Sequence, residues 1–435
     1  MPLRDRHRGI QTFRALRHRN FRYLWLGQVG HACALWMDQV ARAVLILQLT
    51  GSALALSLVI ATRLVPILLF GLLAGAIADR ADRKKILLTT QCVTLGSHLF
   101  LGVAVVAGFI EAWQVFVTAF VAGTAMAFNQ PVRQSLIPMV VPREDVLNAI
   151  ALNSTAVSLM RIGGGSLAGV LLIPFNVGGV YLVAVGVYVF VTLTTILLHI
   201  PPKEGPVREQ KSIAADLAEG YRYIRERPNL GLVTMLALIL FIFAFPFQQV
   251  FVPLLATETL AIGDSGVGFL QGATGAGAVL GSLVIASWGG VRRPGLQLVI
   301  NMIILGCALV LISLQQTVIG TGALLAVAGS MTVTYMSFTN SILLDNAESH
   351  MHGRVMSLLS LDRGLIPLGS ILAGVLVSTI GVRGGLFVLG VTVLGLSLLA
   401  LFFFGRRLAA IRTGVSETTP TEPGASESTT SPYSR

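Results

Sequence analysis

Six polar or ionisable side chains interrupt long apolar segments of the chain. Four of them lie in the first segment: Gln28, His31, Asp38 and Arg42. With Leu35 in the series, their intervals are three, four, three and four residues, which places them on one face of a helix. Arg63 and Arg161 interrupt two later segments. Charged groups are expensive to hold in an apolar layer, so they usually mark a site or a path for a charged species.

The depths of the three most isolated charges agree. At 1.5 Å per helical residue, Asp38 and Arg161 lie about 21 Å from one surface, and Arg63 lies about 14 Å from the opposite surface. In an apolar layer about 30 Å thick, these levels agree within about 5 Å. We therefore predict a buried cluster of Asp38 with Arg63, which the long side chain of Arg161 could join.

Asp38 is the deepest acid in the first half of the chain, and two interpretations of it stay open. Desolvation favours a protonated carboxyl group, which could carry a proton, whereas a nearby arginine favours a permanent ion pair. Arg42, one helical turn away, is the simplest structural partner. His31 and His98 are weaker candidates for carrying a proton.

In the second half of the chain, four polar side chains could line a shared cavity: Gln248, Gln249, Tyr335 and Asn340. Polar residues between membrane helices often only bond their neighbours, so these are candidates for substrate contact or for packing. Three cysteines, Cys33, Cys92 and Cys307, lie in apolar segments without metal-like spacing. We expect them to be packing residues, and we predict no metal site.

The apolar segments themselves predict an all-α membrane protein. Of the 435 residues, 54% are hydrophobic and only 12% charged, and the mean hydropathy is +0.78. We predict twelve transmembrane helices, at residues 23–49, 54–78, 86–108, 113–138, 146–172, 178–199, 230–255, 264–288, 296–314, 318–344, 355–380 and 384–404. These form an N-terminal six-helix lobe (23–199) and a C-terminal six-helix lobe (230–404).

Connectors rich in Lys and Arg alternate along the chain with connectors that have few basic residues. This alternation predicts how the protein is oriented in the membrane. The basic connectors include the N-terminus (1–22), while the opposite side carries only Arg383 and the acids Glu111, Glu258 and Asp264. Basic loops face the cytoplasm, so both termini are expected there. Residues 200–229 are predicted to form a cytoplasmic amphipathic linker, and 405–435 a disordered tail.

One connector has a recognisable spacing. Residues 75–85 read GAIADRADRKK, with Gly75, Asp79, Arg80, Arg83 and Lys84 where the second helix gives way to the third. This resembles the signature gating loop of the major facilitator superfamily, which implies the major facilitator fold. Asp82 stands where many members have glycine, so a different turn geometry is expected.

Further motifs resemble the bacterial drug and siderophore exporters grouped with the enterobactin exporter. They include FNQPVRQSLIP at 128–138 and GRVMS at 353–357. The resemblance implies proton-driven antiport. The helix 5 antiporter motif of that group is incomplete, because Gly165 stands where proline is expected, beside Gly164 and Gly169. Glycine can also break a helix, so a flexible kink is expected there.

Two segments suggest an internal repeat. Residues 165–171 (GSLAGVL) recur with one insertion at 369–376 (GSILAGVL), at matching places in the two lobes. The predicted helix 264–288 has a surface of small residues that suits close helix contact, formed by glycines 268, 272, 275, 277 and 281.

The sequence favours a secondary active transporter that exports siderophore-like or drug-like small molecules by alternating access. No phosphate-binding loop, catalytic triad or cofactor motif is present, so we expect no enzyme and no cofactor. We expect the energy to come from an ion gradient of protons. We do not expect nucleic acid to be a partner. We expect the protein to be a monomer in the bacterial inner membrane. The alternatives are an uptake facilitator and a non-transporting receptor or scaffold. The excess of arginine over acid suits an anionic cargo, whereas apolar cavity walls would suit an amphipathic drug.

Overall fold

The computed structural model describes residues 11–200, 222, 226–287, 293–346 and 364–411, and nearly all of them are helical. The N-terminal lobe contains η1 (Gln11–Arg17), α1 (Arg19–Thr50), α2 (Ala53–Arg80), α3 (Arg83–Val106), α4 (Ala112–Val140), η2 (Arg143–Asp145) and α5 (Val146–Leu197). The C-terminal lobe contains α7 (Pro228–Ile239), η3 (Leu240–Ala244), η4 (Phe247–Phe251), α8 (Val252–Leu254), η5 (Leu255–Thr259), α9 (Gly263–Ser287), α10 (Pro294–Leu314), α11 (Val318–Asn346) and α13 (Ile366–Ala410).

The helices are long and apolar enough to cross a membrane. Among the described residues, ten continuous stretches meet that requirement. Their outward faces carry large apolar side chains, such as Ile319 (84% exposed) and Phe402 (81% exposed), which suit lipid and not water. The protein is therefore a multi-pass membrane protein, as predicted.

Two of the ten stretches turn back on themselves. At 52 residues, α5 would be about 78 Å long if straight, far more than a bilayer. Its backbone breaks at Asn176, where φ is +53° and Oδ1 accepts a hydrogen bond from the amide of Gly178. Asparagine tolerates this left-handed conformation better than other side chains. Gly381, with φ +76°, breaks α13 in the same way. Counting both reversals, the stretches are consistent with the twelve predicted spans.

Contacts at the ends of α5 confirm its reversal. Near its start, Asn148 accepts a hydrogen bond from the amide of Ala15, just before α1. Just past its end, His199 donates its amide hydrogen to Asn20, at the start of α1. Both ends of α5 therefore lie on the side of the molecule that holds η1, here called the terminal side. The side with the breaks at Asn176 and Gly381 is called the turn side.

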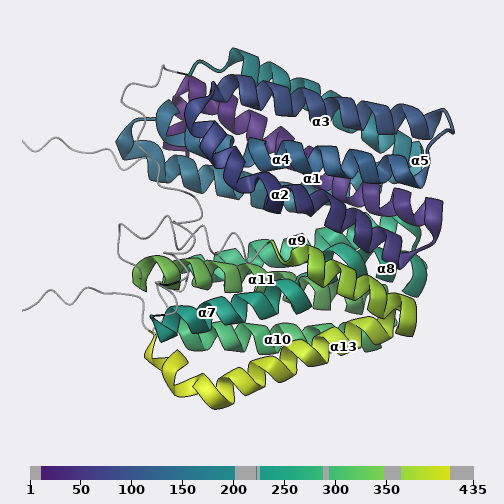
Figure 1. Cartoon of the computed structure of the whole chain (residues 1–435), viewed down its shortest axis with the longest axis vertical. Coiled ribbons are helices and arrows are strands. Elements are labelled where there is room, and N and C mark those ends of the chain that lie inside the picture. The colour runs from purple at the N-terminus through teal and green to yellow at the C-terminus, as the bar shows by residue number, and fades with distance from the viewer. Residues whose placement is uncertain (1–10, 201–221, 223–225, 288–292, 347–363, 412–435) are drawn as a thin grey trace, which may run out of the picture.

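The two lobes lie one above the other in Figure 1, with α1–α5 in one and α7–α13 in the other. They meet through two helix pairs, α5 with α9 and α2 with α13. Glycines allow close approach in both pairs, for example between Gly169 and Gly268 and between Gly374 and Ser57. Gln48, near the end of α1, donates a hydrogen bond of 2.6 Å to Asp264 at the start of α9. These contacts close the molecule on the turn side.

The segment Pro228–Thr259 is helical but irregular. Its three π-helical turns, η3, η4 and η5, surround Pro246 and Pro253. Proline lacks the backbone N–H that donates to the preceding helical turn, so a carbonyl of that turn is left without its helical donor and can accept a hydrogen bond from another group. Gln271 of α9 donates to the carbonyl of Gln248, at 3.0 Å. This contact ties the irregular segment to its neighbour.

Several predictions fall outside the described residues. Most of the linker at 200–229, residues 347–363 before α13, and the tail beyond 411 belong to this group. The amphipathic linker and the disordered tail stay predictions.

Candidate functional site

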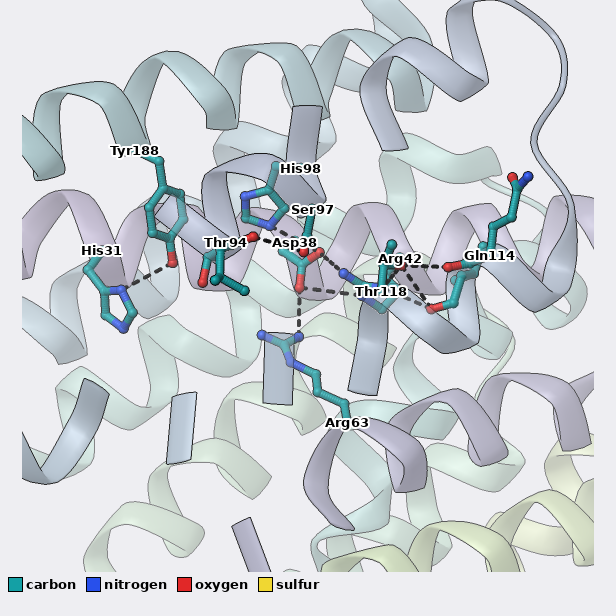
Figure 2. A network of polar contacts seen from close by, with 12 residues as sticks. His31, Asp38, Arg42, Arg63, Thr94, Ser97, His98, Gln114, Thr118 and Tyr188 are labelled. Carbon is teal, nitrogen blue, oxygen red and sulfur yellow. Dashed lines mark hydrogen bonds and ion pairs between the residues drawn. The ribbon is translucent and has the colours of Figure 1, made fainter. Parts of the chain in front are cut away.

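The carboxylate of Asp38 is the centre of a buried charged cluster in the N-terminal lobe (Figure 2). It is 2% exposed and has three basic neighbours. Arg42 Nη2 lies 2.8 Å from Oδ1, Arg63 Nη1 lies 2.9 Å from Oδ2, and His98 Nε2 lies 3.4 Å from Oδ1. These side chains come from α1, α2 and α3. An unpaired charge at this depth would be strongly unfavourable, so the arginines stabilise the carboxylate as the carboxylate stabilises them.

Arg42 is fixed by bonds to three residues. Besides its bonds to Asp38, its Nη1 donates to the carbonyl of Val115 at 3.2 Å and to Thr118 Oγ1 at 3.0 Å. The side chain is 4% exposed. Arg42 is therefore an anchor that joins α1 to α4 as well as a partner of Asp38.

Arg63 is held more loosely than Arg42. Its Nη1 contacts Asp38, and within the described part of the chain its other two nitrogens have no hydrogen-bond partner. The side chain is 14% exposed. Figure 2 shows it reaching the carboxylate from the side opposite His98. A guanidinium group has five N–H donors, so most of its bonding capacity is unused.

Two cavities meet at Arg63. The first, of about 20 Å³, lies inside the N-terminal lobe and is lined by residues from α1–α5, among them His31, Asp38, Thr94, His98, Asn129 and Tyr188. This volume is enough for one water molecule. The second, of about 170 Å³, lies between the lobes, because Gln249 of the C-terminal lobe lines it together with α1, α2 and α4. We call these the inner cavity and the central cavity.

The central cavity has mostly apolar walls. Its lining is Leu35, Trp36, Gln39, Arg42, Ala43, Leu56, Val59, Ile60, Arg63, Leu64, Met126 and Gln249. Trp36 Nε1 and Gln39 Nε2 are buried, and neither has a hydrogen-bond partner among the described residues. Such a surface suits an amphipathic molecule that offers a few acceptor atoms.

His98 lies against two tyrosine rings of α5. Its ring centroid is 5.7 Å from that of Tyr181 and 5.2 Å from that of Tyr188. Neither ring nitrogen makes a hydrogen bond in the described structure. His31 is engaged differently, because its Nδ1 lies 3.1 Å from the hydroxyl oxygen of Tyr188. The two histidines therefore differ in their hydrogen-bond partners.

Arg161 does not join the Asp38 cluster. Its guanidinium carbon lies 5.1 Å from the ring centroid of Trp36, in a cation–π arrangement, and no ion pair of Arg161 occurs among the described residues. The depth estimate placed Arg161 at the right level, but depth does not determine the side of the helix from which it projects. The predicted membership of Arg161 is thus corrected.

The remaining cavity candidates have mixed positions. Gln249 lines the central cavity, whereas the buried Gln248 bonds α9 through its carbonyl. Gln28 is also buried, with an Oε1 that has no partner among the described residues. Tyr335 is 1% exposed, and Asn340 is half-buried; neither lines the central cavity.

The predicted gating loop is only partly described. The environment of Gly75 and the side chains of Asp79 and Arg80 lie outside what the structure describes. Asp82 begins α3 by accepting hydrogen bonds from the amides of Lys84 and Lys85, which explains a turn without glycine. Lys84 Nζ donates to the carbonyls of Ile196 and Leu198, at the end of α5. Arg83 lies beside Met139 of α4.

The glycines of helix 5 do not form the expected kink. Asn176 is the one non-helical position within α5. The glycines instead allow neighbours to approach: a Cβ at Gly164 would meet Cys33 and Trp36 of α1, and a Cβ at Gly169 would meet Gly268 and Ser265 of α9. The physical reason is that close packing on both sides supports a regular helix.

Sequence reasoning gave His98 too little weight and omitted Trp36 and Gln39. Measured from residue 86, where the third helix was expected to begin, His98 lies about 18 Å deep, close to the level of Asp38. The same depth estimate that paired Asp38 with Arg63 would have placed His98 beside them. Trp36 and Gln39 carry no such signal, because apolar and amide residues are common in membrane helices.

A family model described as transmembrane secretion effector matches residues 10–423. Three relatives have similar sequences over most of their length. Macrolide efflux protein A of Streptococcus pyogenes is 21% identical, covering 83% of this chain and 90% of that protein. The staphyloferrin A transporter of Staphylococcus aureus is 22% identical (86% and 93% covered), and the multidrug efflux pump Tap of Mycolicibacterium fortuitum is 24% identical (82% and 89% covered).

Solved structures with the same fold include a bacterial homologue of the human lysosomal transporter Spinster, in an inward-facing, unoccupied conformation. The TM-score is 0.72 at 16% identity, covering 92% of this chain and 99% of that one. A POT family transporter in complex with a thioalcohol-conjugated peptide also gives a TM-score of 0.72, at 13% identity, with 90% and 96% covered. At these identities, the similarity concerns the fold alone.

Proposed function

The chain belongs to the transmembrane secretion effector family of major facilitator transporters, and on this basis we propose that it exports amphipathic small molecules in exchange for protons. The export direction is taken from relatives that are named efflux proteins and pumps. Energy comes from the proton gradient, without a cofactor and without enzymatic chemistry. The protein works as a monomer in the bacterial inner membrane, with its terminal side in the cytoplasm.

One observation carries this proposal: the central cavity touches the buried charged cluster at Arg63. A cavity between two lobes is where major facilitator transporters would hold a cargo. A buried cluster of ionisable groups next to it is where a proton could be held. Contact between the two is what coupling of cargo and proton requires.

The turn-side contacts correspond to an inward-facing state. Gly169 against Gly268, and Gly374 against Ser57, close the lobes on the side assigned to the cell exterior. Cargo then enters from the cytoplasm. Alternating access requires these contacts to separate when the molecule opens outward.

The chemistry of the central cavity favours an amphipathic cargo without a negative charge. The walls are mainly apolar, and the positive charge of Arg63 is already paired with Asp38. We therefore prefer a drug-like cargo over the anionic cargo that the arginine content suggests. Hydrogen-bond acceptors on the cargo would bond Trp36 and Gln39.

Transport into everted membrane vesicles tests the proposal. The vesicle interior is made acidic, and the probes are a radiolabelled macrolide and the dye ethidium. We expect at least one of the two to accumulate inside the vesicles. Nigericin, which removes the pH gradient, should stop accumulation, and vesicles without the protein give the baseline. Accumulation that persists without a proton gradient would contradict antiport, and failure of both probes would contradict the proposed cargo class.

A further inference from the structure

We propose that Arg63 competes with the cargo for the central cavity, and that protonation of His98 releases Arg63 from Asp38 into that cavity. The inference rests on the proposed function, which it deepens by naming the proton-binding group and the residue that transmits its effect. In the described state, Arg63 is bound to Asp38, so the cavity is free for cargo.

Arg63 is the residue of the cluster that is able to move. It contributes one nitrogen to Asp38, and it lines both cavities. Arg42 is fixed by its further bonds to Val115 and Thr118. A long, flexible arginine side chain with a single tether can turn from one cavity to the other without a change of backbone.

His98 is placed to take over the contact that Arg63 gives up. Its Nε2 is already 3.4 Å from Asp38 Oδ1, and neither ring nitrogen is committed to another hydrogen bond in the described structure. Protonation makes both nitrogens donors. The imidazolium then pairs with Asp38, which remains a carboxylate because Arg42 stays bound to it.

The charges around His98 require that exchange. From α1 it faces Asp38, Arg42 and, farther away, His31; from α2 it faces Arg63. From α5 it faces the neutral Tyr181 and Tyr188. The α4 residues that share the inner cavity with it are uncharged, and the buried Arg133 of α4 acts on its neighbours His31 and Tyr188, which adds to the positive charge of the region.

One acid therefore faces two arginines, and a third positive charge is unfavourable at these distances in a medium of low polarity. When His98 binds a proton, the number of positive charges around Asp38 stays the same if the guanidinium of Arg63 moves away. The proton comes from water in the inner cavity and returns to it when Arg63 rebinds Asp38.

The sign of this coupling fits an exporter. A protonated His98 places Arg63 in the central cavity, where water between the lobes and the amide oxygen of Gln249 accept its hydrogen bonds in place of Asp38. The volume of Arg63 there excludes an amphipathic cargo. Proton and cargo thus bind in alternation, as antiport requires. An anionic cargo bound by Arg63 would have the opposite effect, because it would draw Arg63 from Asp38 and favour protonation, so that both would travel in the same direction.

Trp36 and Arg63 both line the central cavity, so the fluorescence of Trp36 is expected to change when Arg63 enters that cavity. Arg161, which stacks on the same ring, is present in every variant that is compared. The experiment uses the full chain purified in detergent, with the other three tryptophans replaced by phenylalanine. We expect the emission of Trp36 to change with pH, without any cargo, as His98 gains a proton. Both His98→Gln and Arg63→Gln should abolish this response. His31→Gln removes the partly buried histidine that also lines the inner cavity, and it should keep the response.

A response that survives in His98→Gln or in Arg63→Gln would overturn the proposal, as would a flat response in the parent protein. Size-exclusion profiles establish that each variant is folded, and His98→Asn replaces His98→Gln if that variant fails to fold. Vesicle transport by the parent protein tests the proposed function separately. If the parent protein shows proton-driven transport but its Trp36 emission responds to pH independently of His98, this inference is contradicted and the proposed function is not.

Discussion

At the scale of single residues, the two arginines that contact Asp38 have different surroundings. Arg42 makes contacts with α1 and α4 and is 4% exposed, whereas Arg63 makes one contact and is 14% exposed. A residue that is bonded on every side stabilises the fold, and a residue with unused donors beside a cavity is available for function. The same residue type therefore serves two purposes within one cluster.

Replacing each arginine by methionine should separate these purposes. Arg42→Met removes one partner of the buried Asp38 and the guanidinium donor to Val115 and Thr118, and it should lower the free energy of unfolding by about 3–5 kcal/mol. Arg63→Met should lower it by about 1.5–3 kcal/mol, the range for one bond to a charged group. Thermal unfolding of the two purified variants measures the difference. Equal losses would show that the two arginines are equally structural.

The pairing of Asp38 with Arg63 could be predicted from sequence because helical rise converts residue number into depth. The stacking of Arg161 on Trp36 could not, because it depends on the direction in which helix 5 presents its side chains. The contribution of His98 was available from the same depth estimate. Bonds such as Arg42 to the Val115 carbonyl depend on the packing of α1 against α4, which no local pattern encodes.

At the scale of elements, the repeated glycine segment lies at equivalent contacts in the two lobes. Gly169 of α5 meets α9, and its counterpart Gly374 of α13 meets Ala53 and Ser57 of α2. The sequence indicated that the two segments are equivalent, but it predicted a kink at the first of them and not a contact between the lobes. The π-helical turns of Pro228–Thr259 were not predicted, because the prolines there could also have produced a simple bend.

A side chain at position 169 should separate the lobes on the turn side. A Cβ there would lie 2.8 Å from the Cα of Gly268 and from the carbonyl oxygen of Ser265, so Gly169→Leu overpacks the contact at a cost of about 1–3 kcal/mol. We expect the equilibrium to shift away from the described state. Spin labels at Phe109 and Ile319, one in each lobe near the turn side, should report longer distances.

Gly186 provides a control on the other arm of α5, beyond the break at Asn176. A Cβ added there meets nothing within 4 Å, so Gly186→Leu should leave the distances between the labels unchanged. If both variants change them alike, a general effect of leucine on α5 is responsible. If neither does, the contact between Gly169 and Gly268 does not hold the lobes together.

At the scale of the whole molecule, charge is segregated between the two ends of the bundle. The terminal side carries many basic residues, including Arg14, Arg17, Arg19, Arg22, Lys84, Lys85 and Arg143, while the turn side carries Arg383 with the acids Glu111, Glu258 and Asp264. Because the reversals at Asn176 and Gly381 return the chain to the terminal side, each lobe keeps this asymmetry. The positive side is expected to remain in the cytoplasm.

Two equally exposed aromatic residues allow this orientation to be measured. Phe13 on the terminal side and Trp113 on the turn side are each 60% exposed. In a chain whose three cysteines are replaced by serine, Phe13→Cys and Trp113→Cys are treated with a membrane-impermeant maleimide. In intact cells we expect the reagent to label Trp113→Cys and spare Phe13→Cys, and in disrupted cells to label both. Labelling of Phe13→Cys in intact cells would reverse the orientation, and with it the assignment of the described conformation as inward-facing.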